Sequence, residues 1–135
     1  MDVCSINGDI EIVKLLLEAN ADVHIVNNDG MNALMFACMN GNIEAVKVLL
    51  EANADVNRVD EDGYNALMFA CMEGNIEASK LLLEANADID IVNKYGKNAL
   101  MYAEQYEHTE IIELLNKHNN YVMLNGKKYK LVEVK

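Results

Sequence analysis

Short apolar runs alternate with amphipathic segments along the chain. Residues 32–39 read NALMFACM, and residues 65–72 repeat that phrase letter for letter. Each run is followed by a glycine and then by a segment such as NIEAVKVLLEANAD, residues 42–55, in which apolar residues recur every three or four positions. That spacing predicts a helix with one apolar face. We therefore predict pairs of helices, each pair closed by a glycine turn and followed by a polar connector.

The pattern has a period of 33 residues. Four sets of equivalent positions keep this step: Gly30, Gly63 and Gly96; Gly8, Gly41 and Gly74; Asn20, Asn53 and Asn86; Asp22, Asp55 and Asp88. A fixed period of this size is the signature of a repeat architecture. The predicted fold is an all-α solenoid of about four stacked helix-turn-helix units, at 1–29, 30–62, 63–95 and 96–119. The first unit is expected to have a very short first helix, Val3–Asn7.

Asparagine and glycine are predicted to define the helix ends. An asparagine opens the first helix of each later unit, where its side chain can accept a hydrogen bond from an unpaired backbone N–H. Gly41 and Gly74 end two of these helices, because glycine adopts the left-handed conformation at low cost. Asn53 stands just after a second helix, at the position where asparagine is the usual substitute for glycine.

The repeated unit resembles the ankyrin repeat over roughly residues 1–119. The resemblance rests on G-x-N-A-L-M-x-A followed by G-N-I-E-A-x-K-x-L-L-E-A-N-A-D, at the right period. It implies stacked helix pairs that bind other proteins. The Thr-Pro-Leu-His of the family becomes Asn-Ala-Leu-Met at 32–35 and 65–68. This change removes a proline from the first helical turn and hydroxyl–imidazole hydrogen bonds between repeats, so we expect methionine packing to supply more of the stability.

The last unit and the tail depart from the pattern. Glu104, Gln105, Glu107 and His108 occupy the last unit, and a polar final repeat is what a solenoid needs to end in water. Residues 120–135 form a separate tail, in which Asn125-Gly126 predicts a C-terminal β-hairpin with Val122 opposite Tyr129 and Leu124 opposite Lys127. The hairpin caps the last repeat, or joins two chains or recruits a partner through its open edge; disorder is the third alternative.

Composition narrows the function. The net charge of −11 argues against nucleic acid and against an anionic membrane surface as partners. No stretch approaches the ~20 apolar residues of a membrane span, and the N-terminus lacks the pattern of a signal peptide. Three cysteines fit a reducing compartment better than a disulfide framework. The cytoplasm is the expected location, with an exported effector as the alternative.

The cysteines and histidines suggest no catalysis. Cys38 and Cys71 are equivalent residues in adjacent repeats, where helices stacked ~8–10 Å apart hold them beyond the ~7 Å that a disulfide tolerates. We expect both to be small buried apolar residues. The three histidines share no metal-ligand spacing and are predicted to face solvent. No catalytic, cofactor-binding or metal-binding residue is predicted, and the protein is not expected to be an enzyme.

The segment Asp60–Gly63 begins like a calcium-binding loop, but the match does not continue. Tyr64 stands where a third oxygen ligand would be needed, and the glycine comes too early. The segment is better interpreted as the polar tip of a turn between repeats.

The ankyrin resemblance implies a concave face, formed by turn tips and first helices, that grips a partner protein. The residues predicted there are Val26, Met31, Met39, Val59, Tyr64, Met72, Val92, Tyr95 and Tyr106. Tyrosine and methionine are enriched in interface cores, and we predict Tyr64, Met72, Met39 and Val59 as the centre. The alternative is that these residues pack against neighbouring turns. Nearby acidic residues favour a partner with a basic patch: Asp29, Asp60, Glu61, Asp62 and Glu73. The alternative function is a homodimer assembled through the hairpin.

Overall fold

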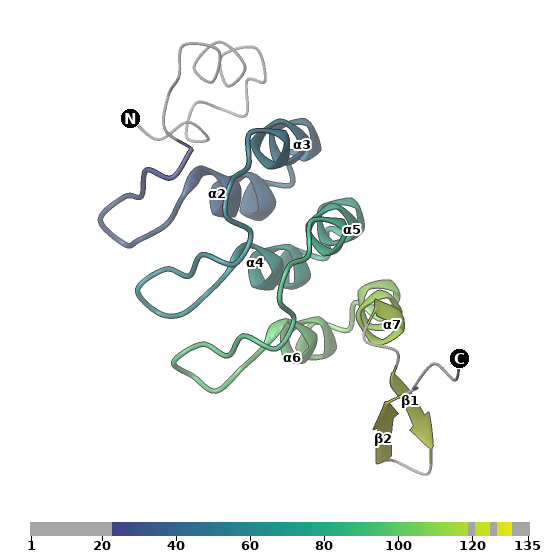
Figure 1. Cartoon of the computed structure of the whole chain (residues 1–135). Coiled ribbons are helices and arrows are strands. Elements are labelled where there is room, and N and C mark those ends of the chain that lie inside the picture. Colours follow the sequence, from purple (N-terminus) through teal and green to yellow (C-terminus); the bar gives the residue numbers. More distant parts are fainter. Residues whose placement is uncertain (1–22, 119–120, 125–126, 131–135) are drawn as a thin grey trace.

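Two layers of helices make up the folded part of the chain. The computed structural model describes residues 23–118, 121–124 and 127–130. The helices in these ranges form three pairs: α2 (Ala33–Asn40) with α3 (Ile43–Glu51), α4 (Ala66–Glu73) with α5 (Ile76–Glu84), and α6 (Ala99–Gln105) with α7 (Thr109–His118). Figure 1 shows α2, α4 and α6 stacked in one layer and α3, α5 and α7 in the other. The predicted helix Val3–Asn7 lies outside the described residues, and the unit boundaries remain predictions.

The helix ends follow the predicted chemistry. The side-chain oxygen of the asparagine before each first helix accepts a hydrogen bond from the backbone N–H three residues later, at 2.8–2.9 Å: Asn32 with Met35, Asn65 with Met68 and Asn98 with Met101. Gly41 and Gly74 end α2 and α4 with φ of 69° and 70°. Asn53 follows the end of α3 with φ of 62°. These predictions are confirmed.

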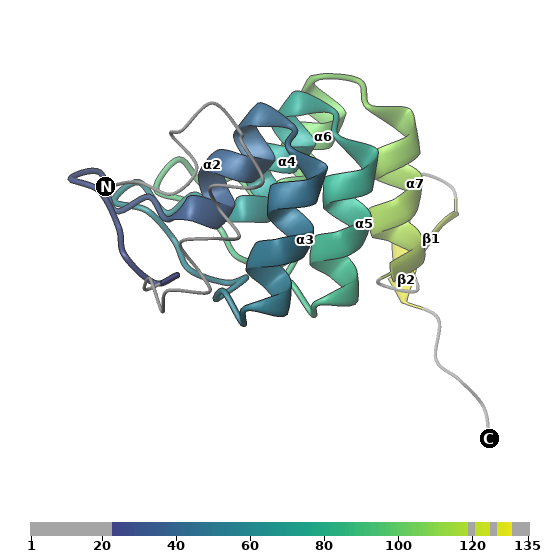
Figure 2. The same ribbon diagram turned by 90° about the horizontal axis from the view of Figure 1, so that it is seen from above.

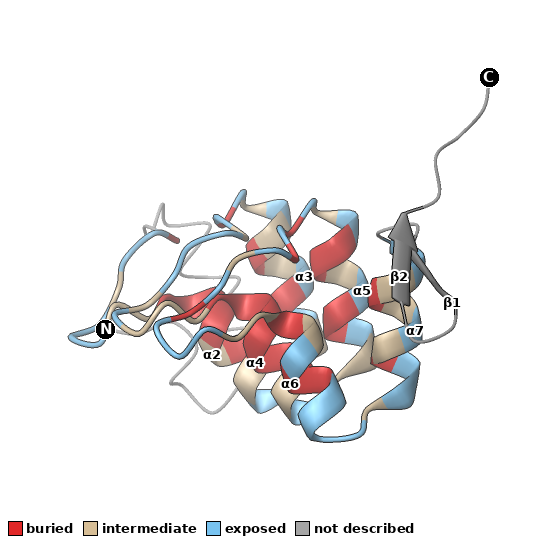
Figure 3. Cartoon of the chain, turned by 90° about the horizontal axis from the view of Figure 1, so that it is seen from below, coloured by how far each residue is buried: buried red, intermediate tan, exposed pale blue. Residues whose placement is uncertain are grey.

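The core lies on the facing sides of the stacked helices. Leu34 and Met35 of α2 and the equivalent Leu67 and Met68 of α4 are fully buried. Figure 3 shows buried segments concentrated on the helices, whereas the loops beside them are largely exposed. Met35 and Met68, which replace the histidine of the family's motif, are therefore core residues, as we expected.

The tail contains two strands, β1 (Tyr121–Leu124) and β2 (Lys127–Lys130). They pair antiparallel, with Val122 opposite Tyr129 and Leu124 opposite Lys127. Residues 125–126 between them lie outside the described residues, so the turn at Asn125-Gly126 remains a prediction.

Candidate partner-binding surface

Three loops project from the same side of the stack, each ahead of a first helix (Figures 1 and 2). We name them loop 1 (27–31), loop 2 (60–64) and loop 3 (93–97). The first residue of each loop accepts two backbone hydrogen bonds, from the residues two and four positions later, at 2.9–3.0 Å: Asn27, Asp60 and Asn93. These bonds hold the short loops in one conformation.

Backbone hydrogen bonds link the loop tips into a continuous row. Glu61 N donates to Asp29 O at 3.0 Å, and Lys94 N donates to Asp62 O at 2.9 Å. We call the contact of loops 1 and 2, with α2 against α4, the first joint. The contact of loops 2 and 3, with α4 against α6, is the second joint. The hydrogen bonds between adjacent repeats thus fix the positions of the loop tips. The tips therefore form a rigid surface that presents side chains.

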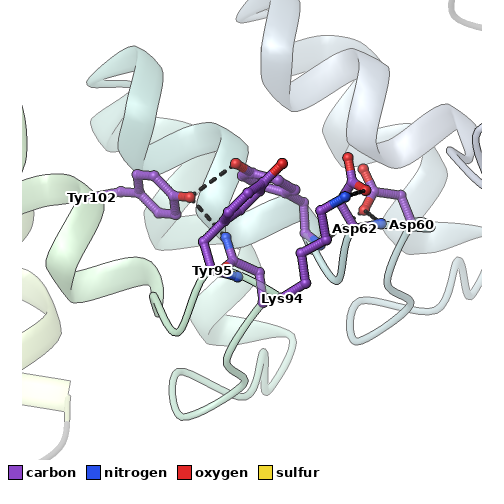
Figure 4. Close-up of polar contacts among 7 residues, drawn as sticks. Asp60, Asp62, Lys94, Tyr95 and Tyr102 are labelled. Atoms are coloured by element: carbon purple, nitrogen blue, oxygen red, sulfur yellow. Dashed lines mark hydrogen bonds and ion pairs between the residues drawn. The ribbon is translucent and has the colours of Figure 1, made fainter.

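Tyrosines fill the second joint (Figure 4). Tyr102 of α6 donates a hydrogen bond from its hydroxyl to the Tyr64 hydroxyl at 3.0 Å, and Asn93 Nδ2 donates to the Tyr102 hydroxyl at 2.7 Å. The Tyr64 ring also stacks on Phe69 at a centroid distance of 5.4 Å and meets Tyr95 edge-on at 6.3 Å. The hydrogen bond with Tyr102 and burial raise the pKa of Tyr64 well above its usual value of 10, so the hydroxyl stays neutral.

Two lysines of loop 3 are engaged within the molecule. Lys94 Nζ lies 2.6 Å from Asp62 Oδ1 and 5.2 Å from the centre of the Tyr95 ring. Its hydrogen bond with Asp62 raises the pKa of Lys94, which keeps the ammonium charged. Lys97 Nζ donates to Gln105 Oε1 at 2.7 Å and lies 5.4 Å from the centre of the Tyr102 ring. Between these two lysines, Tyr95 of loop 3 is 59% exposed.

The residues predicted to bind a partner divide into two groups. Five are half-buried: Val26, Met31, Met39, Tyr64 and Met72. Val26 pairs with Asn32 in an isolated bridge, and the other four pack against the core. Four are exposed: Val59, Val92, Tyr95 and Tyr106. The predicted centre is therefore mostly a packed layer, and the accessible part of the surface lies farther along the row of loops.

Two further apolar residues are exposed that were not among the predicted binding residues, Ile25 and Met101. Met101 is 47% exposed, although the equivalent Met35 and Met68 are fully buried. The exposure of Met101 could have been predicted from its place in the sequence. α6 is the first helix of the last repeat, and the residues after α7 depart from the repeat pattern. The Asn93–Tyr102 hydrogen bond was also missed, although tyrosine replaces the phenylalanine of 36 and 69 only at 102.

A family model for ankyrin repeats, in three copies, matches residues 1–93 and 53–128. The chain belongs to the ankyrin repeat family. No curated protein matches the chain closely enough to indicate a relative. Ankyrin repeats are generally protein–protein interaction modules, and the loop region of this chain carries three exposed apolar residues, Val59, Val92 and Tyr95. None of the helices in the described parts of the chain is long and apolar enough to cross a membrane.

His108, in the last ankyrin repeat, was predicted to face solvent. Its ring is instead half-buried, stacks on Tyr106 at a centroid distance of 6.2 Å and places Nε2 3.2 Å from Met72 O. A Cβ added at Gly74 would lie 2.6 Å from the ring, so the imidazole occupies the space that glycine leaves open. His108 thus contributes to packing between the last two repeats.

Cys38 and Cys71, one in each NALMFACM segment of this ankyrin stack, are buried, as predicted. Burial raises the pKa of the Cys71 thiol to about 12, and a hydrogen bond with Ser79 offsets only part of that effect. A neutral thiol is a poor nucleophile and a poor metal ligand. Among residues 23–118 and the two strands, no cluster of three histidine, cysteine, aspartate or glutamate residues is placed to hold a metal ion.

Proposed function

We propose that this ankyrin protein binds a partner protein on the loop surface, which we define as the tips of loops 1 to 3 together with the exposed residues Val59 and Val92 that precede loops 2 and 3. The observation that carries the proposal is the exposure of Val59, Val92 and Tyr95, at 41%, 54% and 59%, in or directly before two loops that a backbone hydrogen bond links. Exposed apolar residues gathered on one surface tend to mark interaction sites. Because the loops are already ordered, docking loses little conformational entropy.

Tyr95 is the best anchor on this surface. Its ring is exposed, yet its edge-on contact with Tyr64 and its contact with Lys94 restrict its motion. A restricted aromatic ring buries a large area at low entropic cost, which is typical of hot-spot residues. Tyr64 itself is less suited to a test, because its replacement would also break the hydrogen bond with Tyr102.

The proposal is tested with Tyr95→Glu and a matched control, Met101→Glu. Both residues are large, apolar and about half exposed, but Met101 lies on α6 and not on a loop. Proteins captured from a lysate of the source cells by the unmodified chain are identified, and their affinities are measured by calorimetry. We expect Tyr95→Glu to weaken binding about thirtyfold or more, with Met101→Glu close to the unmodified chain. Equal binding by all three proteins would refute the loop surface.

The tail supports a second candidate function, assembly of two chains. β1 and β2 form a two-stranded sheet in the described part of the tail, and an open strand edge is a template for pairing with another chain. Light scattering of the full chain and of a chain ending at residue 119 tests this: a dimer that becomes a monomer on truncation supports it, and one-chain masses for both proteins exclude it. The cytoplasmic location is likewise a proposal, which cell fractionation tests.

A further inference from the structure

The two joints place different charges at the same position. In the second joint, Asp62 and Lys94 meet as an ion pair at 2.6 Å. The equivalent residues of the first joint are Asp29 and Glu61, whose backbones are also hydrogen-bonded. Both are exposed carboxylates, and neither has an ion-pair partner among the residues that the structure describes. Like charges on adjacent loops repel each other, whereas a cation between them would be attracted by both.

The remaining charges of the loops do not supply that cation. Asp60 uses Oδ1 to accept two backbone hydrogen bonds within loop 2. Lys94 and Lys97 are held by Asp62 and Gln105. Arg58 is exposed and precedes Val59, outside the loop tips. The row of tips is therefore acidic at the first joint, whereas loop 3 and the residue before it present two exposed apolar side chains, Tyr95 and Val92.

We infer that the partner presents a lysine or arginine together with a large apolar side chain, and that the two dock on different loops. This inference rests on the proposed function of the loop surface and names the chemistry of its partner. The cation lies between Asp29 and Glu61 and contacts Asp29 as Lys94 contacts Asp62 in the next joint. The apolar side chain packs on Val92 and Tyr95. Exposed apolar residues supply the affinity, and the carboxylates orient the segment and accelerate association.

The spacing of the repeats sets the spacing of the two side chains. Stacked helices are separated by ~8–10 Å, so the acidic joint and loop 3 lie about one to one and a half repeats apart. An extended chain advances about 3.3–3.6 Å per residue. A basic residue and an apolar residue about three or four positions apart in an extended segment therefore reach both places at once.

The experiment selects partners by chemistry alone. A random peptide library displayed on phage is panned against the full-length chain, and enriched peptides are synthesised for calorimetry. We expect them to share a lysine or arginine about three or four positions from a large apolar residue. Tyr95→Ala should weaken their binding about tenfold.

The decisive variant is Glu61→Lys, with Glu113→Lys as its control. Glu61→Lys supplies an internal cation to Asp29, so it should weaken peptide binding at least tenfold. Glu113→Lys makes the same charge change on an exposed position of α7 and should change binding less than twofold. Because the contact is ionic, rising salt should weaken binding to the unmodified chain and leave the Glu61→Lys protein less affected.

Each outcome decides between the two proposals. Peptides that depend on Tyr95 and on Glu61 support both. Peptides that depend on Tyr95 but lack a basic residue, or bind Glu61→Lys and Glu113→Lys equally, overturn the inference and leave the loop surface in place. No enrichment, or peptides indifferent to Tyr95→Ala, overturns the loop surface together with the inference.

Discussion

The first and second joints close with the same backbone hydrogen bond, from Glu61 to Asp29 in one and from Lys94 to Asp62 in the other. Their side chains differ. The second joint has a tyrosine pair, a buried asparagine and an ion pair between the loops. The first joint has a methionine where loop 2 carries Tyr64, and two carboxylates in place of the ion pair.

This difference separates what builds the repeat from what the repeat presents. The loop conformation depends on an asparagine or aspartate at its first position and a glycine three residues later, and all three loops keep both. The residues at the other loop positions differ among the three loops, except for the aspartate shared by positions 29 and 62. Function is therefore expected at the varied positions, and stability should be most sensitive at the repeated ones.

The largest effect is expected from Gly63→Ala in loop 2. Gly63 has φ of 86°, and an added Cβ would lie 2.9 Å from Asn93 Cα, a backbone atom that cannot move without distorting loop 3. Left-handed strain costs about 1–2 kcal/mol, and the clash adds to it. We expect a loss of about 3 kcal/mol or more in the free energy of unfolding, measured with urea.

Gly96→Ala is the matched control in loop 3. Gly96 has φ of 76°, but an added Cβ would meet no atom within 4 Å. Its replacement should cost only the strain, about 1–2 kcal/mol. Equal losses for the two variants would show that the contact between loops 2 and 3 is not the reason for glycine at position 63.

Tyr102→Phe should remove the tyrosine hydrogen bonds that help to distinguish the second joint from the first. The change leaves Asn93 Nδ2 and the Tyr64 hydroxyl without their partner in a largely buried site. An unsatisfied buried polar group costs about 1–3 kcal/mol, so we expect a loss of about 2 kcal/mol. Tyr106→Phe removes a hydroxyl from an exposed ring and should change stability by less than about 0.5 kcal/mol. Similar values for both would mean that the hydrogen bonds of the second joint contribute little.

Glu107→Gly should stabilise the last repeat. Glu107 has φ of 58° and occupies the position of Gly41 and Gly74 in the earlier repeats. Glycine relieves the left-handed strain, so we expect a gain of about 1 kcal/mol in thermal or urea unfolding. Glu104→Gly is the control, because Glu104 lies inside α6, where glycine costs about 1 kcal/mol. A loss of stability in both variants would contradict the strain at Glu107.

The repeated features were predictable from the sequence because each depends on contacts within one unit. Asn65 caps α4 through a backbone group three residues away, and Gly74 ends the same helix. Asn53 adopts the left-handed conformation for the same local reason. Residue type and spacing contain all the information that such contacts require, so the period and the helix ends agree with the structure.

The accessible surface was harder to predict because burial depends on the neighbouring unit. Tyr64 and Tyr95 look alike in the sequence, yet Tyr64 packs against Phe69 and Tyr102, whereas Tyr95 lies at a loop tip. His108 was expected in solvent, but its ring occupies the space beside Gly74 of the preceding repeat. Contacts between units separated by about one period are not specified by the pattern of either unit alone.

The smallest effect on stability is expected from converting the first joint into a copy of the second. Glu61→Lys replaces the repulsion with Asp29 by the attraction that Lys94 has for Asp62. An exposed ion pair contributes about 0.2–1 kcal/mol, so the unfolding free energy should rise by about 0.5 kcal/mol in low salt. Glu113→Lys makes the same change in net charge on α7. Its effect on the unfolding free energy therefore measures how much of that gain comes from the reduced net charge alone. If Glu61→Lys exceeds this control in low salt and matches it in high salt, the gain is ionic and local to the joint. If it does not exceed the control in low salt, the carboxylates of Asp29 and Glu61 are too far apart to share one cation, and a partner's lysine would not bridge them either.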